Sequence, residues 1–92
     1  MRIISQNGTI DVPYEMSAIR NNDGLIILCM VGETGKGSVI ATYSTSEKAQ
    51  KVMEMLREKY KDYTKATNKS NFFTMFDYPK VFQFPKDEDV EV

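Results

Sequence analysis

The segment from Ser44 to Lys65 carries a long helical periodicity, which limits the folds open to this chain. Its apolar residues recur at intervals of three or four and so follow one face of a helix: Ala49, Val52, Met53, Leu56, Tyr60 and Tyr63. Before them, Ser44-Thr45-Ser46-Glu47 predicts a capping box with Ser44 as the N-cap. A helix with one apolar face needs a second layer to pack on, and the remaining chain must supply it.

A β-hairpin is predicted at the start of the chain. Arg2 to Ser5 and Thr9 to Val12 are short runs of β type, and Asn7-Gly8 lies between them. This dipeptide is a strong hairpin signal because both residues tolerate a positive φ. Pro13 closes the predicted hairpin.

Three more extended runs precede the helix: Glu15 to Arg20, Leu25 to Val31 and Ser38 to Ser44. The first two are separated by Asn21-Asn22-Asp23-Gly24, which is rich in residues that accept left-handed turns. In the third run, alternation predicts that Val39, Ala41 and Tyr43 share one face.

After the helix the pattern returns to β type. Val81 to Phe84 alternates between Pro79 and Pro85, which favours an edge strand because proline cannot donate a ladder hydrogen bond. Residues 86–92 contain four acidic side chains and predict a solvated acidic tail on a single domain of residues 1–85. The alternative is that the Val90-Glu91-Val92 ending adds to a sheet edge. The expected fold is α+β: a small antiparallel sheet of about four to six strands, packed by one amphipathic helix, with a C-terminal edge strand.

Composition excludes several kinds of chemistry. The chain has 92 residues, no histidine and one cysteine, Cys29. A Cys/His zinc site, a Ser-His-Asp triad, a Cys-His pair and an intrachain disulfide are therefore excluded within one chain. We predict a protein that is not an enzyme, holds no metal or cofactor, and works in a reducing cytoplasm.

Charge and hydropathy restrict the partners. Twelve basic against thirteen acidic residues leave a net charge of −1, so direct DNA or RNA binding is not expected. The longest apolar run, Leu25 to Val31, is far shorter than the roughly 20 residues of a membrane helix. The charge is nevertheless uneven, at −1 over 1–46, +3 over 47–69 and −3 over 70–92. This pattern fits a phosphate-binding middle segment, or two ordinary solvated faces.

Gly32 to Ser38 resembles a nucleotide phosphate-binding loop only in part. That motif needs four residues between its first glycine and the Gly-Lys pair, and serine or threonine directly after the lysine. Here Met30 occupies the first glycine position and Gly37 follows Lys36. The segment joins two predicted strands, so no helix N-terminus faces an anion there. We interpret it as a hairpin loop.

Large aromatic residues crowd the C-terminal quarter of the chain. So small a core has little room for them, and a short chain without disulfides or metals gains stability by self-association. We therefore expect a homodimer or larger oligomer. The predicted interface residues are Phe72, Phe73, Phe76, Phe82 and Phe84. The alternative is that these rings cap one end of the core.

Two stretches resemble a known group of proteins. Met1-Arg2-Ile3-Ile4-Ser5-Gln6-Asn7-Gly8 with Asp11-Val12-Pro13-Tyr14-Glu15, and then Tyr43-Ser44-Thr45-Ser46-Glu47-Lys48-Ala49, resemble small proteins of phages and integrated elements in Gram-positive bacteria. They are similar to the N-terminal part of the phage anti-Thoeris sponge family. The resemblance implies an oligomer that sequesters cyclic ADP-ribose or cyclic oligonucleotide signals without catalysis, in the cytoplasm of an infected or lysogenic host. It covers roughly the first sixty residues and stops near Asn68.

Candidate ligand residues follow from the chemistry of such signals. Guanidinium and ammonium groups bind phosphate, and an aromatic ring stacks on adenine. The candidates are Arg2, Tyr14, Arg20, Lys36 and Arg57.

Two other functions remain open. The chain could be an anti-CRISPR-like inhibitor of a host defence nuclease, with an acidic tail that occupies a nucleic-acid channel. The residues for that role are Asp87, Glu88, Asp89 and Glu91. It could also be a structural or regulatory phage protein whose partner is itself.

Overall fold

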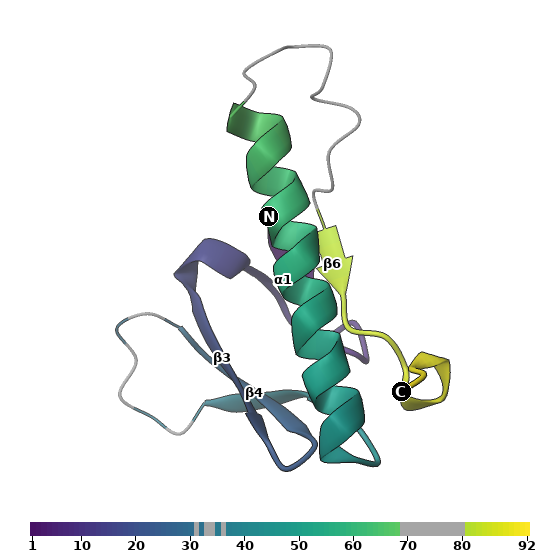
Figure 1. Cartoon of the computed structure of the whole chain (residues 1–92). Coiled ribbons are helices and arrows are strands. Elements are labelled where there is room, and N and C mark those ends of the chain that lie inside the picture. The colour runs from purple at the N-terminus through teal and green to yellow at the C-terminus, as the bar shows by residue number, and fades with distance from the viewer. Residues whose placement is uncertain (31, 33–34, 36, 69–80) are drawn as a thin grey trace.

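One long helix packs on two three-stranded sheets (Figure 1). The structure is a computed structural model and describes residues 1–30, 32, 35, 37–68 and 81–92. The terminal sheet has the strand order β2 (Asp11–Pro13), β1 (Arg2–Ile4), β6 (Val81–Gln83). The central sheet has the order β3 (Ser17–Asn22), β4 (Leu25–Met30), β5 (Ser38–Thr42), and the helix α1 spans Ser46–Asn68. The predicted α+β class is confirmed.

The strands are divided between two sheets, and one pairing is parallel. β6 runs parallel to β1 with Phe82 opposite Ile3, whereas the other pairings are antiparallel. β6 is an edge strand, as its flanking prolines predicted. The backbone N–H of Gln6 donates to the Ile40 carbonyl at 2.8 Å, so the chain just after β1 is joined to β5. This contact links the two sheets.

The first hairpin forms where Asn7-Gly8 predicted it. β1 and β2 pair with Ile3 opposite Val12, and Gly8 has a φ of +78° in the loop. Asn7 acts through its side chain, because its Oδ1 accepts hydrogen bonds from the Thr9 backbone N–H at 3.1 Å and the Thr9 hydroxyl at 2.7 Å. Because Ile4 pairs with Asp11, the loop is longer than a two-residue turn.

The second hairpin has a tight turn. Asn22 pairs with Leu25, and the two residues between them have positive φ values, +51° at Asp23 and +95° at Gly24. This is the type I′ turn that suits the twist of an antiparallel ribbon. The strand predicted from Glu15 begins only at Ser17, because the short 3-10 helix η1 (Tyr14–Met16) precedes it.

The prediction that Val39 shares a face with Ala41 and Tyr43 is wrong. Ala41 pairs with Ile26 and Val39 with Ile27, which are adjacent residues of β4 and point to opposite faces. A register shift in this ladder, a β-bulge, changes the alternation. Val39 is consequently 52% exposed, whereas Ala41 is buried.

The helix begins one residue later than the capping box implied. The Thr45 hydroxyl, not that of Ser44, accepts the backbone N–H of Lys48 at 3.1 Å. The predicted apolar face is confirmed: Ala49, Val52 and Leu56 are buried in the core, and Met53, Tyr60 and Tyr63 pack against it.

Two phenylalanines assigned to a subunit interface lie in the core instead. Phe82 and Phe84 are 7% and 1% exposed and meet edge to face at 5.3 Å. Strand alternation points Phe82 at the helix layer with Ile3, so neither ring offers surface to a second copy. Phe72, Phe73 and Phe76 lie outside the described residues.

The C-terminal segment is docked, which corrects the expectation of a solvated tail. Val90 is buried in the core at 5% exposure. A short 3-10 helix, η3 (Asp87–Asp89), precedes it. The Asp87 Oδ1 accepts hydrogen bonds from the Ser44 backbone N–H at 2.8 Å and the Ser44 hydroxyl at 3.1 Å. The acidic segment therefore holds the turn that leads into α1.

Candidate functional site

Three tyrosine rings, one from η1 and two from α1, form a cluster. Tyr14 of η1 lies 4.5 Å from Tyr60 of α1 between ring centroids, and Tyr60 lies 5.9 Å from Tyr63. All three side chains are partly buried, so each packs on the core and keeps some contact with solvent. We call Tyr14, Tyr60 and Tyr63 the tyrosine cluster.

The position of Tyr14 is fixed by contacts on both sides of η1. Its backbone N–H donates to the Met1 carbonyl at 2.8 Å, and the Ser17 hydroxyl donates to the Pro13 carbonyl at 2.7 Å. The ammonium group of Met1 pairs with the Glu15 carboxylate at 2.8 Å. Partial burial raises the pKa of Glu15, but hydrogen bonds from this ammonium and from the backbone outweigh it, and the pKa is lowered. Tyr14 therefore sits on a well-anchored turn.

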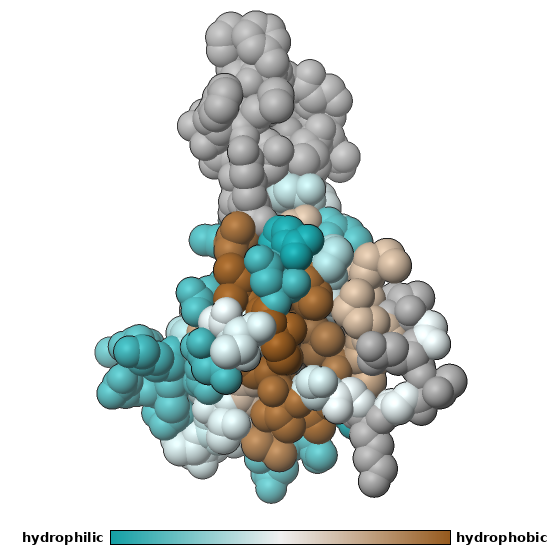
Figure 2. Space-filling view, turned by 180° about the vertical axis from the view of Figure 1, so that it is seen from behind, coloured by the Kyte–Doolittle hydropathy of each residue, from teal (hydrophilic) through white to brown (hydrophobic). Residues whose placement is uncertain are grey.

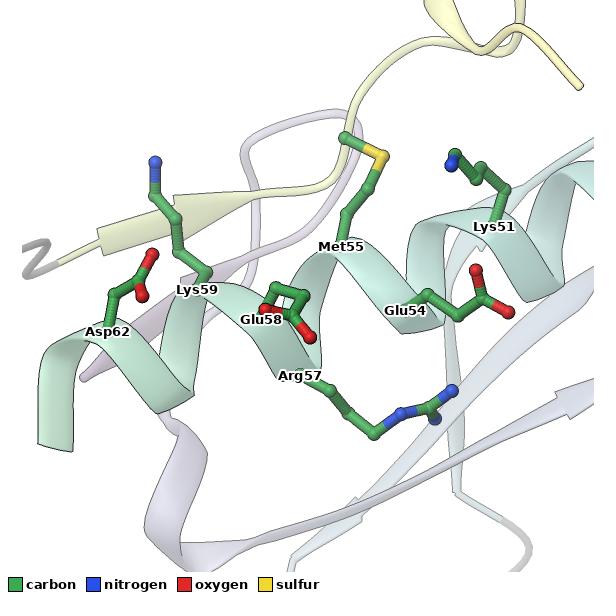
Figure 3. A pocket seen from close by; sticks show the side chains of 7 residues that line it. All are labelled: Lys51, Glu54, Met55, Arg57, Glu58, Lys59 and Asp62. Atoms are coloured by element: carbon green, nitrogen blue, oxygen red, sulfur yellow. The ribbon is translucent and has the colours of Figure 1, made fainter. Parts of the chain in front are cut away.

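Cationic side chains flank the cluster on the helix. Arg57 precedes Tyr60 by three residues and Lys61 follows Arg57 by four, so both lie on the same flank of α1. Both are exposed. Arg57 points away from Lys51, Met55 and Lys59, toward the other side of the helix (Figure 3). Exposed positive charge therefore lies within about one helical turn of Tyr60 on α1.

The five predicted ligand residues do not all come together. Tyr14 lies in the tyrosine cluster, and Arg57 is exposed on α1 three residues before Tyr60. Arg2 lies on the face of the terminal sheet turned away from Ile3 and pairs with Asp11 at 2.7 Å. Arg20 is exposed on β3, on the face opposite to Ile19. Lys36 lies outside the described residues.

Sequence reasoning missed Tyr60 and Tyr63 as site residues. Both were assigned to the packing face of the helix, which is correct for their position but incomplete for their chemistry. The signal was the change from aliphatic to tyrosine side chains along that face after Leu56. A tyrosine at a partly buried position presents a ring that can also stack on a ligand.

A hollow on the outer helix surface is a weaker candidate. Its described lining comes from α1 alone: Lys51, Glu54, Met55, Arg57, Glu58, Lys59 and Asp62 (Figure 3). Three cations and three carboxylates alternate there, so the surface is electrically balanced. It shows no described second element that would hold a ligand in one orientation.

The face opposite the helix is apolar along a central stripe (Figure 2). Leu25, Val39 and Val81 are 37%, 52% and 47% exposed on strands of the two sheets, and Ile27 lies on the same face of β4 as Leu25. Arg20 lies opposite Ile27 and Arg2 lies opposite Val81, so charged side chains share these strand faces with the apolar residues.

The described part of the chain contains no cluster of three or more cysteine, aspartate or glutamate side chains suited to a metal ion. The charges of α1 rule it out as a membrane span, and no other described helix qualifies. Comparisons of the sequence and structure with protein-family models, curated proteins and solved structures give no match.

Proposed function

We propose that this protein binds a nucleotide signal without converting it, and that the tyrosine cluster with Arg57 and Lys61 is the binding site. An aromatic side chain stacks on any nucleobase, with a contribution of about 1–3 kcal/mol per base. A guanidinium group binds phosphate through two parallel hydrogen bonds. The site offers both kinds of contact on adjacent turns of one helix.

The 4.5 Å contact between Tyr14 and Tyr60 carries the proposal. It holds a ring from a short 3-10 turn against a ring from the helix, within one helical turn of Arg57. A preformed platform loses less conformational entropy on binding than separate side chains would.

The resemblance to anti-Thoeris sponges suggests the identity of the ligand. We expect cyclic ADP-ribose or a cyclic oligonucleotide, captured by a homo-oligomer in the cytoplasm of an infected or lysogenic bacterium. The proposal omits catalysis because the chain has no histidine and its one thiol, Cys29, lies within β4. The protein would then act by lowering the free concentration of an immune signal.

A thermal-shift panel tests this function. Purified protein is mixed with cyclic oligonucleotides and cyclic ADP-ribose isomers, and the bound ligand is recovered after heat denaturation. A ligand at 100 times its Kd stabilises the protein by about 2.7 kcal/mol, which should raise the Tm by several degrees. Recovery of intact ligand supports capture, whereas altered ligand means catalysis. No shift with any member of the panel contradicts the proposal.

Matched variants locate the site. Arg57→Gln should remove most of the ligand-induced shift, and Tyr60→Leu should reduce it, because each removes one of the two contact types. Lys59→Gln is the control, since Lys59 is an exposed cation of the same helix on a different side. An equal loss in all three variants would place the ligand elsewhere.

The alternative of a nuclease inhibitor depends on the exposed acidic side chains of the C-terminal segment. Glu88, Asp89 and Glu91 are exposed, whereas Asp87 is engaged with Ser44. Deleting the segment would also remove the buried Val90, so charge reversal is the better test. Replacing Glu88, Asp89 and Glu91 by lysine should abolish nuclease inhibition and leave nucleotide capture intact.

A further inference from the structure

The four sheet edges in the described part of the chain are not equally protected against pairing with another strand. β2 contains Pro13, β6 has three residues and is followed closely by Pro85, and β5 is bulged and borders Gln6. Prolines, short length, bulges and covering groups all discourage edge-to-edge pairing. β3 is six residues long, regular and free of proline, and it lies at the margin of the central sheet (Figure 1). In the described part of the chain no further strand pairs with it.

The backbone groups that β3 directs outward follow from its hairpin. The two-residue turn makes Asn22 and Leu25 the hydrogen-bonded closing pair. Hydrogen-bonded and non-bonded pairs alternate along an antiparallel ladder. Ser17, Ile19 and Asn21 therefore direct their N–H and C=O groups away from β4. The Ser17 N–H already donates to the Tyr14 carbonyl. The Ser17 carbonyl and the backbone N–H and C=O groups of Ile19 and Asn21 point toward the position of a neighbouring strand.

We propose that β3 pairs with β3 of a second copy of this chain, antiparallel and about a two-fold axis. The two central sheets then form one continuous sheet of six strands. Ile19 lies opposite its own symmetry mate, and Ser17 lies opposite Asn21 of the other copy. Four backbone hydrogen bonds result, two between the Ile19 residues and two from Asn21 N–H to the Ser17 carbonyl across the axis.

Charge disfavours one alternative register. Residues directly opposite each other in a ladder point to the same face of the sheet. The register can therefore shift only by an even number of residues if α1 of both copies is to stay on the same side of the joined sheet. Moving the axis to Arg20 would set two guanidinium groups directly opposite each other, which is unfavourable. In the proposed register Arg20 lies opposite Ala18, a small exposed residue. Within β3, the proposed register therefore sets no two like charges opposite each other.

This inference does not rest on the nucleotide site, and it replaces Phe82 and Phe84 as the oligomer interface. It is tested by sedimentation equilibrium of the intact protein, which should show a dimer that dissociates on dilution. Amide hydrogen exchange at Ile19 and Asn21 should slow as the protein concentration rises. Two results would overturn the proposal. One is a monomer at all accessible concentrations, and the other is that the β3 amides become protected from exchange only when an unrelated extended peptide is added.

Two substitutions of opposite sign at Ala18 give the sharpest test. Ala18→Glu places a carboxylate opposite Arg20 of the other copy and should tighten the dimer, whereas Ala18→Arg should weaken it. Because the symmetry creates two such pairs, we expect changes of about two- to thirtyfold in the dimer Kd, in opposite directions. Asn22→Glu and Asn22→Arg are the controls, since Asn22 is also exposed and two residues from Arg20 but has no strand residue opposite it. Equal effects at positions 18 and 22 would refute the register.

Discussion

The side-chain amide of Gln6 pairs with the backbone of Thr42 as a neighbouring strand would. Its Oε1 accepts the Thr42 N–H at 3.0 Å, and its Nε2 donates to the Thr42 carbonyl at 3.2 Å. The same Nε2 donates to the Pro85 carbonyl at 3.0 Å. One side-chain amide therefore forms hydrogen bonds both to β5 of the central sheet and to the C-terminal segment after β6, at the place where the two sheets meet.

Replacing this amide should destabilise the fold. Gln6→Met keeps the side-chain length but leaves the backbone groups of Thr42 and the Pro85 carbonyl without this partner. We expect a loss of about 1–3 kcal/mol in the free energy of unfolding, measured by urea denaturation. Gln50→Met, at an exposed helix position, should change the free energy of unfolding by less than about 0.5 kcal/mol. Equal effects would mean that the junction contributes nothing.

The helix cap can be assigned by comparing two substitutions. Thr45→Ala removes the hydroxyl that accepts the Lys48 N–H and should cost about 0.5–2 kcal/mol. Glu47→Gln should cost far less, because the cap begins at Thr45 and Glu47 does not occupy the third helical position. Urea denaturation of both variants decides this. A larger loss for Glu47→Gln would restore the capping box that starts at Ser44.

The Asp87 contact should make stability depend on acid pH. The hydrogen bond from the Ser44 backbone N–H, followed by the Ser44 hydroxyl and the Lys48 charge, lowers the pKa of Asp87 below its ordinary 3.8. A lowered folded-state pKa stabilises the fold above the unfolded-state value, and this contribution is lost as the pH falls through the folded-state value. Asp87→Asn should therefore lower the Tm near neutral pH, and the difference from the natural protein should shrink in acid.

Asp89→Asn is the control for this pH effect. Asp89 is an exposed carboxylate two residues away in the same η3 turn. Its Tm should follow that of the natural protein across the whole pH range. A pH-independent difference for Asp87→Asn would show that the carboxylate charge does not matter at this site.

Two glycines with similar backbone angles should differ in their tolerance of alanine. Gly24 has a φ of +95°, and an added Cβ would lie 2.7 Å from the Tyr43 carbonyl oxygen. Gly8 has a φ of +78°, and its added Cβ would make only an ordinary 3.8 Å contact with Gln83. Gly8→Ala should cost about 1–2 kcal/mol for the left-handed backbone alone, and Gly24→Ala should cost more. Thermal unfolding of both variants tests this order.

Local signals in the sequence predicted much of the fold. The dipeptides around Gly8 and Gly24 located both hairpins, because turn geometry depends on a few adjacent residues. The apolar spacing from Ala49 to Tyr63 located the helix and its buried face. The edge position of β6 followed from Pro79 and Pro85.

Features that depend on distant residues were not predictable. The bulge that turns Val39 outward is defined by its register with β4, and the docking of Asp87 depends on Ser44, 43 residues away. The same holds for the tyrosine cluster, because nothing local indicates that Tyr14 contacts Tyr60. Sequence alone could propose Tyr14 as a ligand residue but could not place it against Tyr60.

The parallel pairing of Ile3 with Phe82 affects how the chain is built during translation. Residues 17–68 contain the central sheet and the helix, whose contacts are close in sequence, and they can form as soon as they leave the ribosome. β1 must wait for β6 before it gains its second neighbour, so the terminal sheet closes last. A stalled or truncated chain that lacks β6 would therefore expose one side of β1.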